Sequence, residues 1–439
     1  MLGYYLQLAL RRCRKSPAMV ALLVLTMAIG IASTMTAMTV FDALSGDPLP
    51  GISNHLYVVT MDSRGADAGD TSSYSAPDSL LKLRDAKALV DAHRAPEQMA
   101  VAWSLTQLGT PDGKQSAQAV GLMAYGPVLT TFGVPLRHGR PWTVAEQTAH
   151  DPVIVIDSKL AEKLFGKANA VGRSVTFGSR QFRIIAVTAP WKPRVKFLGL
   201  VHHNNNPVGQ NLQFFVPAGA ALDAGVGPFM SSRCPKGTTT ISFQSAKVKR
   251  CRWLETWVAL DTPAQVAAYQ RFLTGYAQTQ HDAGRFVHAP QARLYGTRAW
   301  MDINHAVPDD VSLNLMLAGG FLLLCMVNVA GLLAARFLRR QGDTAIRRAL
   351  GASRRHVFAQ HMIEAGLLGL AGGLLALPLT LLGLWVVRMQ PVSYAAAAQF
   401  SVAVFIGLLL LSLIVGLVVG VLPAWRVCRQ PPAMLIKVG

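Results

Sequence analysis

Four long apolar segments constrain this 439-residue chain more than any other feature of its sequence. The first, Pro17–Val40, has 24 residues without a charge, enough to cross about 30 Å of hydrocarbon as a helix. A cleaved signal peptide is the alternative, but its apolar core usually has only about 7–15 residues. Further candidate spans lie at 311–335, 357–387 and 400–422. The sequence therefore predicts an α-helical membrane protein with four transmembrane helices.

Residues 41–310 contain no further span and alternate between strand-like and helix-like stretches. This mixed order predicts a large α+β extracytoplasmic domain inserted between helices 1 and 2. The expected strands are His55–Met61, Val153–Ile156, Val175–Phe177, Phe182–Val187, Phe214–Val216 and Trp253–Leu260. The expected helices are Pro77–His93, Ser158–Phe165 and Thr262–Gln278.

The distribution of charge predicts how the spans are oriented in the membrane. Four basic residues precede the first span, seven arginines lie between the second and third, and three basic residues follow the fourth, against Asp343 alone. The positive-inside rule then places the segment 336–356 in the cytoplasm. It also places there an amphipathic helix over 1–16 and a tail over 423–439. The net charge of +19 therefore indicates topology and gives no support for nucleic-acid binding.

The cytoplasmic segment 336–356 also has the pattern of a short helix beneath the bilayer. Thr344 to Leu350 can form this helix with its apolar residues on one side, and Gly351 is suited to end it. Ser353 can cap the next helix, which continues into the third span. Such a helix suits contact with a cytoplasmic partner. The candidate contact residues are Ile346, Arg347, Arg348, Ala349, Leu350, Gly351, Ala352 and Ser353.

Glu364 is the one acidic residue in or beside the third span. A carboxylate at membrane depth is costly, which makes Glu364 a candidate functional residue. The alternative is that it lies near the inner interface and pairs with an arginine of the loop. Small residues also recur at four-residue spacing, as Gly369 and Gly373 in the third span and as Gly416 and Gly420 in the fourth. Such pairs let helices approach closely, either within one subunit or between two.

Two of the five cysteines, Cys234 and Cys251, fall in the predicted extracytoplasmic domain. Paired thiols on the oxidising side of a membrane usually become bonded, which predicts a structural disulfide. Closing a loop of this length contributes about 3 kcal/mol in the chain-entropy model. Two free thiols in a loop are the alternative.

The sequence shows no catalytic, cofactor-binding or metal-ligating pattern. Its Gly-Lys pairs, Gly113-Lys114 and Gly166-Lys167, both lack the GxxxxGK[ST] frame of a phosphate-binding loop. We therefore expect that this chain is not an enzyme and that it does not hydrolyse ATP itself.

Two stretches resemble permeases of the MacB/FtsX type. Residues 340–373, with Asp343-Thr344-Ala345-Ile346-Arg347-Arg348-Ala349-Leu350-Gly351-Ala352-Ser353 at their centre, resemble the coupling segment of these permeases. Asp343 stands where the family usually has Glu, and Thr344-Ala345 stands where it usually has Ile-Gly. Residues 132–187, with Gly139-Arg140, Trp142-Thr143 and PVIVIDSKLAEKLFG, resemble the MacB periplasmic core domain.

The resemblance implies a permease subunit of a MacB-type ABC transporter in the bacterial cytoplasmic (inner) membrane. Two such subunits, in a homodimer or a heterodimer, would recruit separate ABC ATPase subunits that hold ATP and Mg. No cofactor is expected on this chain itself. Motion of the ATPases would pass through Arg347–Ser353 to the extracytoplasmic domain, without a conduit through the membrane. Besides membrane lipid, the implied partners include a periplasmic adaptor protein.

The implied task is export of a peptide, antibiotic or lipid-linked molecule. Lipoprotein release is an alternative within the same family. A regulatory or sensory FtsX-like protein that controls an extracytoplasmic partner is an alternative of a different class.

Overall fold

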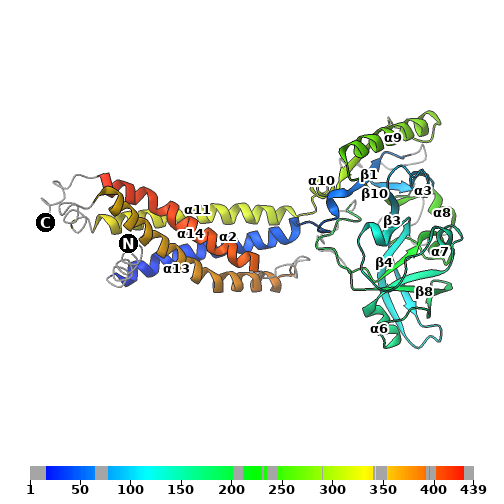
Figure 1. The fold of residues 1–439 in the computed structure, drawn as a ribbon, viewed down its shortest axis with the longest axis horizontal. Coiled ribbons are helices and arrows are strands. Elements are labelled where there is room, and N and C mark those ends of the chain that lie inside the picture. The colour runs from blue at the N-terminus through cyan, green and yellow to red at the C-terminus, as the bar shows by residue number, and fades with distance from the viewer. Residues whose placement is uncertain are drawn as a thin grey trace. The chain divides into compact units, whose positions relative to one another are not determined.

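The computed structural model describes residues 16–64, 78–200, 211–229, 232–234, 245–288, 290–339, 342, 353–391, 395 and 402–429. The chain divides into two compact units, one made of Met1–Leu44 with Val307–Gly439 and the other of Ser45–Ala306. The first unit has four helices long and apolar enough to cross a membrane, and the second is an α+β unit (Figure 1). The fold class expected from the sequence is confirmed.

The membrane unit consists of α2 (Pro17–Ser45), α11 (Asp309–Leu338), α13 (Arg354–Met389) and α14 (Val402–Arg429). Each helix continues beyond one or both ends of its predicted span, because a helix does not need apolar residues once it leaves the hydrocarbon. Pro378 and Pro423 lie inside α13 and α14, which continue past them. The expected helix over 1–16 lies outside the described residues except for Ser16.

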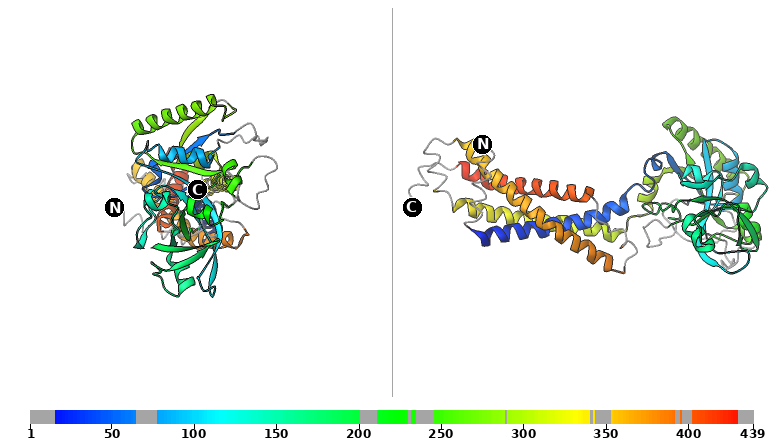
Figure 2. Two further views of the ribbon diagram at one scale, coloured as in Figure 1. Left: turned by 90° about the vertical axis from the view of Figure 1, so that its right-hand side faces the viewer. Right: turned by 60° about the horizontal axis from the view of Figure 1, so that its bottom comes forward.

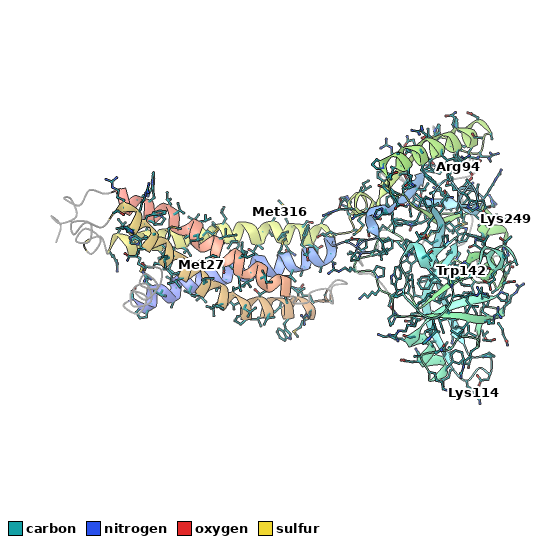
Figure 3. The ribbon with its side chains drawn as sticks, in the orientation of Figure 1. Met27, Arg94, Lys114, Trp142, Lys249 and Met316 are labelled. Atoms are coloured by element: carbon teal, nitrogen blue, oxygen red, sulfur yellow. A yellow bond between two sulfur atoms is a disulfide. The ribbon has the colours of Figure 1, made fainter. Side chains whose placement is uncertain are left out.

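The four membrane helices lie side by side in Figure 1 and in the right-hand view of Figure 2. Met27 of α2 is 2% exposed and belongs to the interior cluster of the bundle, whereas Met316 of α11 is 74% exposed (Figure 3). Large apolar side chains on the outside of a bundle are costly in water but stable against lipid tails. The bundle surface is therefore that of a membrane domain.

In the part of the chain that the structure describes, the extracytoplasmic unit is built on one sheet of eleven strands. Their order is β11-β1-β10-β3-β4-β9-β6-β8-β5, with β2 beside β10 and β7 beside β3 and β8. The strands are β1 (Leu56–Met61), β2 (Leu80–Lys82), β3 (Glu97–Gly109), β4 (Ser116–Tyr125), β5 (Leu136–Gly139), β6 (Val153–Asp157), β7 (Ser174–Phe177), β8 (Arg180–Thr188), β9 (Phe214–Pro217), β10 (Arg252–Ala259) and β11 (Ala292–Gly296).

Successive residues of each strand point to opposite faces, so the sheet has a core on both sides. On β1, Val58 belongs to one buried cluster and Val59 to the other. On β6, Ile154 and Ile156 share a cluster, while Val155 lies in the opposite one. A strand buried on both faces appears in the sequence as a continuous apolar run, and this explains the VIVI stretch.

Short helices cover the sheet. They are α3 (Leu83–Asp91), α4 (Val128–Thr131), α5 (Val144–Thr148), α6 (Ser158–Phe165), α7 (Ala218–Asp223), α8 (Ser245–Arg250), α9 (Pro263–Asp282) and α10 (Thr297–Ile303). The prediction of a helix over Pro77–His93 is wrong at its start, because Leu80–Lys82 pairs with β10 as a strand. Leu80 and Leu81 reach opposite cores, an arrangement that a strand provides.

Candidate functional site

A buried ion pair joins α11 and α13 near the two helix ends that flank the arginine-rich segment. Arg336 lies in the last turn of α11, and Glu364 lies about 15 Å along α13 from its start. Arg336 Nη2 is 3.0 Å from Glu364 Oε1, and each side chain is 2% exposed. Of the two interpretations of Glu364, the structure supports the paired one.

An aromatic contact lies beside this ion pair. The ring of Phe337, which follows Arg336 on α11, is 4.3 Å from the ring of His361, measured between centroids. Both residues are buried, as is Gln360 on the same helix. The ion pair and the ring contact therefore fix α11 to α13 at two adjacent places.

The N-terminus of α13 is capped as the sequence predicted. Ser353 is the N-cap residue, and its Oγ accepts a hydrogen bond from the backbone N–H of His356. Its Oγ is also 2.8 Å from His356 Nδ1. The other candidate contact residues, 346–352, lie outside the described residues. The capped end of α13 thus marks where that segment enters the bundle.

The glycine pairs of the third and fourth spans pack against each other within this chain. A Cβ added at Gly416 would lie 2.8 Å from Gly369 Cα, closer than real Cβ contacts allow. Additions at Gly373 and Gly420 would collide with Ser412 and Ala365. The backbones of α13 and α14 are therefore in close contact along these glycines. Of the two interpretations of these glycines, packing within one subunit explains them.

A cavity of about 610 Å³ lies among α2, α11 and α13. Its lining is mainly apolar and includes Phe321 and Leu317, both exposed on the outside of the bundle. Its polar side chains are those of Ser33, Thr36, Asn314 and Gln390. An apolar cavity with a few polar groups is the usual character of a small-molecule site.

A disulfide joins Cys234 to Cys251 in the extracytoplasmic unit, with their Cα atoms 4.3 Å apart. The backbone N–H and C=O groups of Arg233 and Arg252 exchange hydrogen bonds of 2.8 Å beside it. The disulfide and these hydrogen bonds hold the start of the segment between the cysteines beside its end, where β10 begins.

The Gly139-Arg140…Trp142-Thr143 stretch folds around one carboxylate. The Arg140 guanidinium donates to both oxygens of Glu146, at 2.8 and 2.7 Å. Glu146 also accepts from the backbone N–H of Thr143, whose side chain caps α5 in return. These hydrogen bonds, the one from Arg140 above all, lower the pKa of Glu146 to about 2. These hydrogen bonds connect the residues on either side of Trp142 to the same carboxylate.

Among the residues that the structure describes, no group of three or more His, Cys, Asp or Glu side chains is placed to hold a metal ion.

These features define a multi-pass membrane protein with a large α+β domain between its first and second helices. The MacB-like periplasmic core domain family matches residues 20–275, and the FtsX-like permease C-terminal family matches residues 315–432. The chain belongs to this family of ABC transporter permeases.

The relatives are distant in sequence. The pyoverdine export ATP-binding/permease protein PvdT of Pseudomonas entomophila is 22% identical over 421 residues, covering 94% of this chain and 56% of the relative. The macrolide export ATP-binding/permease protein MacB of Mannheimia succiniciproducens is 22% identical over 327 residues, covering 73% and 44%. The chain spans about half the length of the curated relatives it matches.

Among solved structures, the periplasmic region of MacB from Actinobacillus actinomycetemcomitans aligns with 57% of this chain and 92% of its own length. The sequence identity is 18% and the TM-score is 0.36.

Proposed function

We propose that this chain is the permease subunit of a MacB-type ABC transporter and that it transmits the motion of separate ATPase subunits to its extracytoplasmic domain. The observation that carries this proposal is the buried pair of Arg336 and Glu364. It fastens together the two helices that enter and leave the arginine-rich segment. A force applied to that segment would therefore move both helices together.

The route of that motion follows from the contacts of the bundle. A push on the segment 346–353 would enter α13 at its Ser353 cap and reach α11 through Arg336 and Glu364. The glycine contacts would carry it to α14. In the sequence, the extracytoplasmic unit ends at Ala306 and α11 begins at Asp309, so a short connection joins the two. Two permease subunits, each with an ATPase, would work as a pair.

The test replaces Leu350 with Asp, or Arg347 and Arg348 with Glu, in the full-length protein. The ATPase partner is first identified by co-purification from native membranes, and the complex is then reconstituted in nanodiscs. We expect binding or transport-linked ATPase activity to fall about tenfold or more, because the contact would be lost or uncoupled. Arg293→Glu with Arg298→Glu, a double charge reversal in the extracytoplasmic unit, is the matched control. Unchanged activity and binding in both segment variants would reject the contact.

The orientation is tested with an impermeant maleimide on a cysteine-free background. The proposal places both termini and residues 336–356 in the cytoplasm, because of their positive charge. A cysteine introduced at Gln341 should therefore stay unlabelled in intact spheroplasts and react only after permeabilisation. Labelling in intact spheroplasts would overturn this topology.

Export is the task that the names of the relatives suggest, because these names describe export of pyoverdine and of macrolides. We propose an amphiphilic cargo such as a peptide, an antibiotic or a lipid-linked molecule. The cavity among α2, α11 and α13 supports an apolar part in that cargo. Co-purification of an adaptor protein would support export, whereas a cell-wall hydrolase or a kinase as partner would point to the regulatory role. Accumulation of lipoproteins at the inner membrane of a deletion strain would instead indicate lipoprotein release.

A further inference from the structure

A second pocket, of about 310 Å³, lies wholly within the extracytoplasmic unit. Four segments that are far apart in sequence surround it: the end of α3, the start of β3, the end of β4, and α5. Its volume is at the lower end of the roughly 300–1,000 Å³ typical of ligand sites. It therefore suits one compact chemical group better than a whole drug-sized molecule.

Side-chain hydrogen bonds hold the walls of this pocket in place. Gln98 of β3 donates to the carbonyl oxygens of Leu89 and Val90 at the end of α3, at 3.3 and 3.0 Å. Gln147 of α5 accepts from the backbone N–H of Gly126 at 2.7 Å. These bonds tie α3 to β3 and α5 to the end of β4. The pocket is therefore preformed, which lowers the entropic cost of binding.

The pocket has an excess of negative charge. Among the residues that the structure describes, Asp91 and Glu97 line it with their carboxylates, Lys87 is the one Lys or Arg in the lining, and His93 and His150 also line it. Within the part of the chain that the structure describes, neither carboxylate forms an ion pair. The Tyr125 hydroxyl, also in the lining, responds to this environment: burial, followed by the charges of Asp223 and Asp91, raises its pKa to about 12.

An aromatic ring lies in the same lining. Trp142, half-buried and labelled in Figure 3, belongs to the stretch that Arg140 and Glu146 stabilise. A tryptophan face attracts organic cations, more strongly when the cation leaves water. Nearby carboxylates attract the same group. Aromatic and acidic side chains together select a cation over a neutral molecule of the same shape.

We propose that this pocket binds an organic cation, an amine or a guanidinium on an aliphatic stem. Trp142 supplies the aromatic contact, and Asp91 and Glu97 supply the opposite charge. The same group can be carried by a free small amine or by a basic side chain of a peptide. This binding goes beyond the proposed coupling to an ATPase and does not depend on it, because it needs only the extracytoplasmic unit of the chain.

The test measures binding to the full-length protein in nanodiscs by isothermal titration and by saturation-transfer NMR. The probes are N-acetyl-arginine amide and its uncharged isostere, N-acetyl-citrulline amide. We expect the arginine compound to bind with a Kd at least about tenfold lower than the citrulline compound. Agmatine is the third probe. Agmatine binding tighter than the arginine amide would identify a free amine as the natural source, and the reverse order would identify a peptide.

Variants assign the binding to this pocket. Trp142→Leu and the double variant Asp91→Asn with Glu97→Gln should each weaken arginine-amide binding about fivefold or more. Asp302→Asn, which removes an exposed carboxylate outside the pocket lining, should leave it unchanged. Trp142→Phe keeps an aromatic face and should retain most of the affinity, and its heat denaturation serves as the folding control. Equal binding of the two isosteres, no binding of either, or unchanged affinity in both pocket variants would overturn the proposal.

Discussion

Arg336 and Glu364 form an ion pair between two membrane helices, with Nη2 and Oε1 3.0 Å apart and both side chains 2% exposed. The arginine is the first of the seven that precede the third span, and the acid is the only one in that span. Taking a charge out of water costs several kcal/mol, and this contact offsets part of that cost for both residues.

We predict that Arg336→Met or Glu364→Gln alone lowers the stability of the bundle by about 3 kcal/mol or more, because each change breaks the buried ion pair between Nη2 and Oε1. The double variant Arg336→Met with Glu364→Met should recover most of that loss. Heat denaturation in detergent, followed by size-exclusion chromatography, measures both effects. Arg339→Met, an exposed arginine at the end of the same helix, is the control. A double variant no more stable than the singles would contradict this account of the pair.

We predict that Gly416→Ala disrupts the contact between α13 and α14. The new methyl group would lie 2.8 Å from Gly369 Cα, so the helices must separate at a cost of about 1–3 kcal/mol. Gly320→Ala, on the outside of α11, is a matched control because its Cβ would meet no atom within 4 Å. The two variants are compared by heat denaturation in nanodiscs. Equal stability would mean that this approach of the helices is looser than the structure indicates.

Much of this fold can be predicted from local patterns. Uncharged apolar runs long enough to cross a bilayer predicted the four membrane helices. The stretch Ser158–Phe165, directly after the VIVI strand, predicted α6, and the structure adds that the Asp157 side chain caps this helix. The strands Val175–Phe177 and Phe182–Val187 predicted β7 and β8, and Gly178 between them occupies the left-handed region at φ 58°. In each case the signal lies within a few residues of the element.

Other features depend on contacts that the sequence does not display. Strand β4 contains Gly121, where a Cβ would collide with Phe214 of the neighbouring parallel strand. Gly121 gives no strand signal in the sequence, because its small size is required by that neighbour. The sequence identified Glu364 as a candidate but could not choose its partner among seven arginines, since the choice depends on how α11 and α13 cross. The pocket near Trp142 is formed by four segments that are far apart in the sequence, and no local sequence pattern predicted it.

We predict that the extracytoplasmic unit becomes less stable as pH rises, through Glu255. This residue is fully buried, and burial raises the pKa of its carboxyl even though the Gly199 N–H and the Ser79 hydroxyl donate to it. A carboxyl whose folded pKa exceeds its unfolded value of about 4.3 stabilises the fold below that value. The contribution is lost as pH rises through the folded pKa. Lys196 nearby offsets part of the loss, because its positive charge favours the carboxylate.

Glu255→Gln removes this titration, so the variant should gain melting temperature over the native protein as pH rises. We expect the difference between them to grow by about 2 °C or more from pH 5 to pH 8. Tryptophan fluorescence on heating in nanodiscs measures it. Glu162→Gln, which removes an exposed carboxylate of α6, is the control and should show no such trend. A difference that stays constant with pH would show that Glu255 does not titrate in this range.

We predict that the disulfide between Cys234 and Cys251 forms in the mature protein and stabilises the extracytoplasmic unit by about 3 kcal/mol. Reduction would free the segment between the cysteines while leaving Cys251 in the core, where it is buried beside Trp253 and Val248. Non-reducing peptide mapping identifies the bond directly. Dithiothreitol should lower the melting temperature of the native protein but not that of the double variant Cys234→Ser with Cys251→Ser. Free alkylation of both cysteines under denaturing conditions without a reductant would show that the bond is absent.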